Sequence, residues 1–144
     1  DLRTGWISQP YGGGTPERPR WTALSVQFPR KTALAGLKIV GGPGGLPPEV
    51  YHWQQWDGST WQRISDLRPA ADGTAFVRLK RPVETEGIRV YVMAKELAES
   101  DDPRLNKTLR IAELLLLLPD GRETSVSALF GGPVASSGAS PAPR

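Results

Sequence analysis

Apolar and polar residues alternate along most of the chain, in short runs separated by glycine and proline. Residues 21–28 (WTALSVQF) place Leu24, Val26 and Phe28 on one face. A period of two is the pattern of a strand with one buried face. Runs of the same kind occupy residues 34–40, 49–56, 61–64, 74–80, 87–93 and 109–118. The last run is ambiguous because its leucines also favour helix, but its strand-like neighbours favour a buried strand.

The segments between these runs are typical of turns. Residues 41–48 (GGPGGLPP) exclude a helix or a central strand, because proline lacks a donor and glycine is costly to order. The Asp57-Gly58 pair favours a tight hairpin. Residues 94–104 contain a short helical turn that Pro103 would end. The pattern predicts an all-β, antiparallel jelly-roll β-sandwich of about eight strands.

The domain is expected to span residues 1–130. Residues 131–144 (GGPVASSGASPAPR) carry almost no apolar side chains that would offset the entropy of ordering. They predict a flexible tail or linker rich in Gly, Ser, Pro and Ala. Such linkers join modules, so the domain is expected to belong to a larger protein.

Composition limits the classes of function. The chain has 38% hydrophobic and 23% charged residues, which is ordinary for a globular protein. The net charge of +3 is scattered, and without a basic stripe among aromatics it does not indicate a nucleic-acid partner. The absence of cysteine excludes disulfides, thiolate metal sites and cysteine nucleophiles. The longest apolar run, residues 114–118, is too short for membrane insertion.

No catalytic set is apparent in the sequence. The single histidine, His52, excludes a pair of histidine metal ligands, and no Ser/His/Asp order has a recognisable elbow. The GGPGG stretch lacks the Lys-Ser/Thr that follows a phosphate-binding loop. Asp101 and Asp102 are adjacent acids in a charged loop, which are usually solvated rather than a glycosidase pair. The sequence therefore predicts a domain that is not an enzyme.

Three of the five tryptophans fall within residues 50–61 (VYHWQQWDGSTW). Because strand side chains alternate, Trp53 faces one way while His52 and Trp56 face the other. The favoured interpretation places Trp53 and Trp61 in the core of the sandwich or half in it. The alternative is a sugar-stacking platform, an exposed indole beside polar groups on a concave surface, and Trp56 beside the turn suits that role best. His52 is expected to be a surface strand residue.

Several segments together resemble a known family. Asp1, Thr4 and Trp6 in DLRTGW resemble the D-x-x-T-x-W segment of discoidin-like domains, also called coagulation-factor type C domains, which are galactose-binding-domain-like jelly rolls. PRWTALSVQFPRKTALAGLKIV, YHWQQWDGSTWQRI, GIRVYVM and LRIAELLLL resemble the strands that follow, as far as about Leu118. The family usually has a further strand before the first segment. That strand is therefore expected to be missing, or to be replaced by residues 124–130 (TSVSALF).

The resemblance implies a function. Many bacterial relatives are carbohydrate-binding modules attached to secreted glycoside hydrolases. The chain is accordingly expected to be a non-catalytic carbohydrate-binding or adhesion module of a larger exported bacterial protein, located outside the cell, on its surface or in the periplasm. Its expected partner is a glycan or a neighbouring catalytic domain. The family binds sugars with loops at one end of the sandwich, which implies the ligand-binding residues Tyr11, Arg18, Arg20, Asp101, Arg104 and Asn106.

One departure from the family leaves an alternative open. The loop at residues 41–48 lacks the polar pair that commonly contacts the sugar, and its tip (Leu46, Pro47 and Pro48) is apolar. The alternative is a structural or protein-docking accessory domain with no glycan ligand.

The resemblance also implies a structural calcium ion. In several relatives the ion lies against the segments that correspond here to Asp1, Thr4 and Glu113. Carboxylate and hydroxyl oxygens are suitable ligands for this hard cation. The alternative interpretation makes Thr4 a turn hydroxyl and Glu113 a surface residue at a strand end, without a metal.

Overall fold

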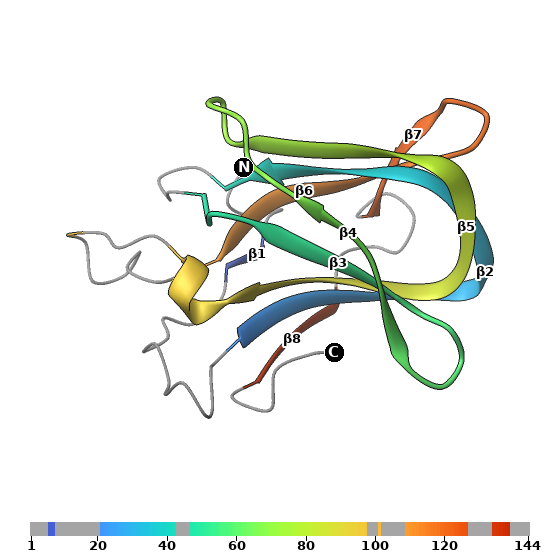
Figure 1. The fold of residues 1–144 in the computed structure, drawn as a ribbon, viewed down its shortest axis with the longest axis horizontal. Coiled ribbons are helices and arrows are strands. Elements are labelled where there is room, and N and C mark those ends of the chain that lie inside the picture. The colour runs from blue at the N-terminus through green and yellow to red at the C-terminus, as the bar shows by residue number, and fades with distance from the viewer. Residues whose placement is uncertain are drawn as a thin grey trace.

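Two long bent strands form the frame of the molecule. The computed structural model describes residues 6–7, 21–42, 47–97, 101, 109–126 and 134–138. Strands β2 (Trp21–Gly41) and β5 (Thr74–Met93) pair antiparallel over most of their length. Both curve around one side of the molecule and pass from one layer of the sandwich into the other (Figure 1). Each was predicted as two separate strands, and both are continuous.

The bend occurs where the register of the two strands shifts. The first shift in β2 lies between Gln27 and Thr32, and the second between Leu34 and Gly36. Pro29 and Pro82 both lie in stretches of these strands that the β2–β5 register leaves without partners. Proline has no N–H to donate, so it is tolerated at such irregular positions. A bulge increases the local bend of a strand, which explains how one strand serves both layers.

The first layer contains the end of β5 and the beginning of β2. On one side, β8 (Val134–Gly138) pairs with residues 21–25 of β2. On the other side, β3 (Tyr51–Trp56) pairs with β5, and β4 (Trp61–Leu67) pairs with β3. Strand β8 lies within residues 131–144, the segment that was expected to be a flexible tail or linker.

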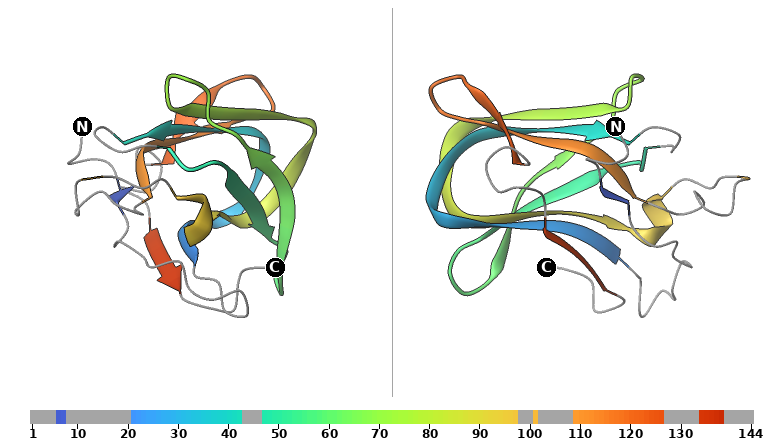
Figure 2. Two further views of the ribbon diagram at one scale, coloured as in Figure 1. Left: turned by 60° about the vertical axis from the view of Figure 1, so that its left-hand side comes forward. Right: turned by 180° about the vertical axis from the view of Figure 1, so that it is seen from behind.

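The second layer contains the other halves of β2 and β5 together with β6 (Arg110–Leu117). The strands β1 (Trp6–Ile7) and β7 (Glu123–Ser125) both pair with β6. The two layers and the strands at their edges are visible from behind in Figure 2. Strand β7 overlaps the start of the TSVSALF stretch that was expected to supply an edge. The predicted helical turn appears as a 3-10 helix, η1 (Ala94–Glu96).

The space between the layers is filled by apolar side chains from the alternating runs. Trp53 is 0% exposed, and the ambiguous leucine run is a strand whose Leu114 and Leu116 are buried in the core. Other large buried side chains of this core are Leu24, Leu34, Leu37, Ile39, Tyr51, Ile88 and Val90. The predicted antiparallel β-sandwich is therefore confirmed. Within the described residues, no helix has the length and apolar character needed to cross a bilayer.

Candidate functional site

The outer face of the first layer carries rows of side chains that cross four strands. The side chains of His52, Gln54 and Trp56 point outward from β3, while Tyr51 and Trp53 point into the core, as alternation predicted. The pairing registers align these outward residues with partners in the neighbouring strands. The rows are Asp66–His52–Tyr91, then Arg63–Gln54–Arg89–Ser25, and finally Trp61–Trp56–Gly87–Gln27.

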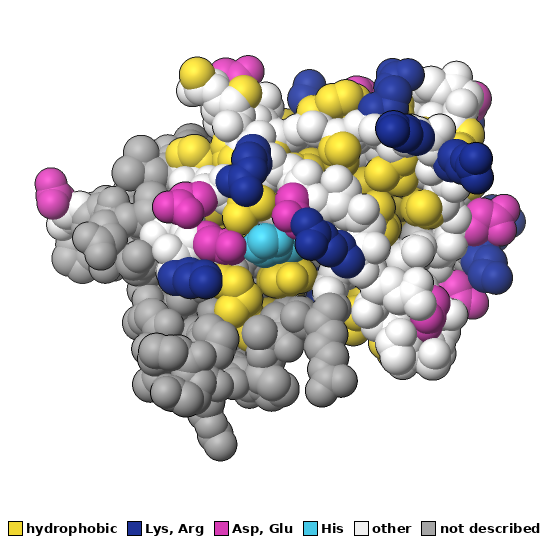
Figure 3. Space-filling view, viewed as in Figure 1, with side chains coloured by type: hydrophobic (Ala, Val, Ile, Leu, Met, Phe, Trp, Pro, Cys, Tyr) yellow, Lys and Arg dark blue, Asp and Glu magenta, His cyan; other side chains and the backbone are white. Residues whose placement is uncertain are grey.

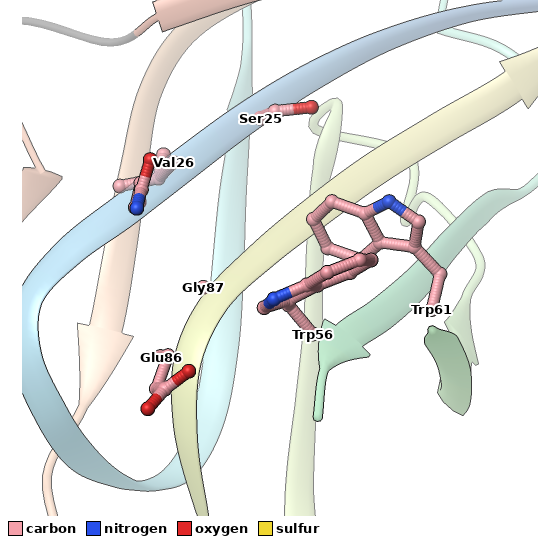
Figure 4. A pocket seen from close by; sticks show the side chains of 7 residues that line it. Ser25, Val26, Trp56, Trp61, Glu86 and Gly87 are labelled. Carbon is pink, nitrogen blue, oxygen red and sulfur yellow. The ribbon is translucent and has the colours of Figure 1, made fainter. Parts of the chain in front are cut away.

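The third row contains a hollow because Gly87 has no side chain. The hollow has a volume of about 460 Å³ and is lined by Ser25, Val26, Gln27, Trp56, Trp61, Glu86 and Gly87. Figure 4 shows the two indoles on one side and Glu86 on the other, with Gly87 between them. A Cβ atom at Gly87 would lie 3.0 Å from the Val26 carbonyl oxygen and 3.8 Å from Trp56 Cβ. Glycine therefore permits both the close strand pairing and the open space, and we call this site the Trp56–Trp61 hollow.

The two indoles of the hollow support each other. Trp56 and Trp61 are both half-buried, and their ring centroids lie 5.3 Å apart at an angle of 60°. This is the edge-to-face arrangement that aromatic rings favour. Trp61 was expected, like Trp53, in the core or half in the core; it begins β4 opposite Trp56 and is half-buried on the outer face. Trp53 is fully buried and Trp61 is half-buried, and the register places their rings on opposite sides of the sheet.

Arg89 holds the ring of Trp61 in place. Its guanidinium carbon lies 4.4 Å from the Trp61 ring centroid, within the range of a cation–π contact. Its Nε donates a hydrogen bond to Gln54 Oε1 at 2.7 Å. Burial lowers the pKa of the Arg89 guanidinium, yet arginine keeps its charge at neutral pH. Arg89 and Gln54 of the second row thus hold Trp61, which forms one wall of the hollow.

In the first row, both ring nitrogens of His52 contact carboxylates. Nδ1 lies 2.9 Å from Asp66 Oδ1, and Nε2 lies 2.9 Å from Glu96 Oε2. The imidazole also stacks on Tyr91 with centroids 4.7 Å apart. Burial, with a further contribution from the two carboxylates, raises the pKa of Tyr91. Figure 3 shows the histidine among acidic and basic side chains on this face.

The two carboxylates that contact His52 are held by further hydrogen bonds. The Asp66 carboxylate also accepts a hydrogen bond from Arg63 Nη2 at 2.6 Å, and Glu96 Oε2 accepts one from the Met93 N–H at 3.1 Å. The two carboxylates lie 14 and 44 residues from His52 in sequence, and the fold brings them to it. Because both ring nitrogens are engaged, His52 is not available as a base or a metal ligand in this arrangement.

Most of the site residues that the sequence predicted lie outside the described residues. These are Asp1, Thr4, Tyr11, Arg18, Arg20, Arg104 and Asn106. Asp101 is described and exposed. Glu113 is half-buried in β6, and its Oε1 accepts a hydrogen bond from the Leu114 N–H at 3.0 Å. Among the residues that the structure describes, no three His, Cys, Asp or Glu side chains form a group that could hold a metal ion.

Only part of the Trp56–Trp61 hollow could be predicted from the sequence. Trp56 was singled out because it precedes the turn, but Ser25, Gln27, Glu86 and Gly87 were not. The one feature of the sequence that could have indicated them is Gly87 at the start of an apolar strand. Glycine in a strand often marks a close approach of backbone or ligand. The site requires the registers of three pairings, which no local pattern specifies.

No protein-family model matches the chain, and no curated protein matches it. Several solved structures do. The structure of the CBM32-1 and CBM32-2 domains of ZmpB from Clostridium perfringens has a TM-score of 0.56 and 13% identity, covering 83% of this chain and 29% of that one. The family 32 carbohydrate-binding module of EndoD from Streptococcus pneumoniae has a TM-score of 0.58 and 10% identity, covering 82% and 80%.

A third structure is the family 32 module of NanJ from C. perfringens in complex with galactose. It has a TM-score of 0.52 and 13% identity, and the match covers 78% of this chain and 91% of that one. At these low identities the likeness concerns the fold. The chain therefore has the fold of family 32 carbohydrate-binding modules, and the resemblance to discoidin-like domains is confirmed at that level.

Proposed function

We propose that this domain is a non-catalytic carbohydrate-binding module that holds a sugar in the Trp56–Trp61 hollow. The observation that carries the proposal is a pair of partly exposed indoles beside polar side chains, in an open depression. The C–H face of a sugar ring packs against an indole because both surfaces are apolar. The amide of Gln27 and the carboxylate of Glu86 supply hydrogen-bonding partners for the sugar hydroxyls.

The size and chemistry of the hollow suit binding. Its volume of about 460 Å³ falls within the range of about 300–1,000 Å³ that is common for small-ligand sites. A glycosidase needs two carboxyl groups about 5–10 Å apart across the scissile bond. Only one of the seven lining residues, Glu86, carries a carboxylate. These features support binding without hydrolysis.

Further contacts are proposed at the loop end of the sandwich. The residues are Tyr11, Arg18, Arg20, Asp101, Arg104 and Asn106, and the exposure of Asp101 supports this part of the proposal. We also propose a structural calcium ion held by Asp1, Thr4 and Glu113. The pairing of β1 with β6 supports it, because Trp6 lies opposite Ile111, two residues before Glu113. The ion would tie the start of the domain to β6.

The domain is proposed to belong to a larger exported bacterial protein, where its partners are a glycan and a neighbouring catalytic domain. The match to the ZmpB structure supports the multidomain part, since this chain spans 29% of that chain. The family resemblance supports a location outside the cell, on its surface or in the periplasm.

The docking alternative has less support. Its key residue, Leu46, lies outside the described residues. Among the described residues, Phe76 at 49% exposure is the one large apolar side chain that is exposed. A single exposed apolar residue is ordinary on a protein surface and does not define a docking patch.

A sugar titration with matched variants tests the function. The wild-type domain is titrated with galactose, glucose and their amino and N-acetylamino derivatives, while tryptophan fluorescence is followed. We expect dissociation constants in the millimolar range. Trp56→Ala should weaken binding about tenfold, because about 1.4 kcal/mol of stacking is lost. Phe76→Ala, which removes an exposed ring from the other layer, is the control and should bind normally. The absence of binding by the wild type would refute the proposed function.

A further inference from the structure

The Trp56–Trp61 hollow has a negative charge at its edge. Glu86 is the only ionisable residue among the seven that line it, and its side chain is exposed. A Cβ atom on Gly58 would lie 3.9 Å from Glu86 Oε2, so the carboxylate stands beside the turn that joins β3 to β4. In the described part of the chain, no cation forms an ion pair with Glu86. Its charge is therefore available to a ligand.

The other charged groups around the hollow are engaged. Asp57 Oδ1 accepts hydrogen bonds from the N–H groups of Ser59 at 2.8 Å and Thr60 at 2.7 Å. Its charge has the same sign as that of Glu86 and is directed into the turn. Arg89 is bonded to Gln54 and packs on Trp61. Of the two indoles, Trp56 has no cation packed on its ring among the described residues, so its ring can receive one.

We infer that the ligand of the hollow is an amino sugar, bound with its protonated amine between the Glu86 carboxylate and the Trp56 ring. This inference rests on the proposed function and specifies its ligand class. A carboxylate attracts an ammonium group by direct charge pairing, and an indole attracts it through the negative face of the ring. Sugars that carry a carboxylate or sulfate group would be repelled by Glu86. Neutral sugars would keep the stacking contact and lose the charge contact.

The test compares sugars that differ at one substituent. Galactosamine, galactose and galacturonic acid, and the corresponding glucose series, are titrated into the wild-type domain at pH 6, where the sugar amines are protonated. We expect the amino sugar of at least one series to bind about threefold to tenfold more tightly than its neutral parent, with the acidic sugar weakest. This is the size of effect that an exposed charge pair with a cation–π contact produces.

Two charge variants assign the preference to Glu86. Glu86→Gln should reduce the ratio of amino-sugar to neutral-sugar affinity to about one. Glu84→Gln removes the same charge from an exposed position of β5 that does not line the hollow, and it should retain the preference. Equal affinities of the wild type for amino and neutral sugars, or equal loss of the preference in both variants, would refute this inference alone. A wild type that binds no sugar of either series would instead refute the proposed function.

Discussion

Two aromatic residues at the centre of the sandwich bury a polar atom. The Tyr51 hydroxyl and Trp53 Nε1 are buried, and within the described part of the chain neither has a hydrogen-bond partner. A buried polar group without a partner costs free energy relative to its hydrated state in the unfolded chain. Burial also raises the pKa of Tyr51 to about 12. Two predictions at this scale follow from the contrast between these core residues and the residues on the outer face.

The first concerns Tyr51→Phe. In the unfolded chain a tyrosine titrates near pH 10, roughly two units below the value in the folded state. As pH rises from about 10 to 12, the unfolded state releases this proton first, so the free energy of unfolding falls by roughly 3 kcal/mol. Tyr51→Phe should lack this part of the alkaline loss. At pH 7 it should cost less than about 1 kcal/mol, because the lost hydroxyl has no hydrogen-bond partner among the residues that the structure describes.

Urea denaturation of both proteins at pH 7, 10 and 11.5 measures these differences. If the free energy of unfolding falls equally at alkaline pH in wild type and Tyr51→Phe, Tyr51 is not the cause of that fall. A cost above about 2 kcal/mol for the variant at pH 7 would also contradict the prediction.

The second concerns the two tryptophans that the sequence treated alike. Trp53→Ala should lower the free energy of unfolding by about 3–5 kcal/mol, because it empties a fully buried site. Trp61→Ala should cost only about 1–2 kcal/mol, since its ring is half-buried and loses a contact with Arg89. Chemical denaturation of both variants measures the difference. Equal costs would mean that Trp61 belongs to the core after all.

At the scale of elements, alternation predicted the positions of most strands but not their continuity. Pro29 and Pro82 both lie where the β2–β5 register has no partners, so the strands continue through them. Strand β8 was missed because VASSG offers almost no apolar alternation, and its order comes from pairing with the edge of β2. Backbone pairing with an existing edge is a tertiary effect that local sequence does not report.

Calcium is predicted to act on the junction between β1 and β6. If Glu113 and the segment before β1 hold the ion, it stabilises the folded state by about 2.7 kcal/mol at a hundredfold excess over its dissociation constant. A chelator should then lower the melting temperature of the wild type, and Glu113→Gln should remove most of that sensitivity. Glu123→Gln, an exposed residue of β7, is the matched control. An identical melt with and without chelator would contradict the calcium proposal.

At the scale of the whole molecule, the sequence predicted the class of fold and only part of the site. Trp56 was recognised because it stands next to a turn. The remainder of the hollow comes from three strands aligned by their registers, so Gln27 and Gly87 become neighbours of Trp56 only in the folded sandwich. His52 shows the same effect, because its two carboxylates are distant in sequence. Long-range pairing decides which residues meet, and local patterns do not determine it.

The proposed sugar site lies on the outer face of the sheet, at the Trp56–Trp61 hollow. The most direct measurement follows the indole N–H signals of the five tryptophans by ¹H–¹⁵N NMR during titration with an amino sugar. Binding at the hollow should shift the signals of Trp56 and Trp61 to saturation and leave that of the buried Trp53 unchanged. Saturable binding that leaves the Trp56 and Trp61 signals in place would contradict this prediction.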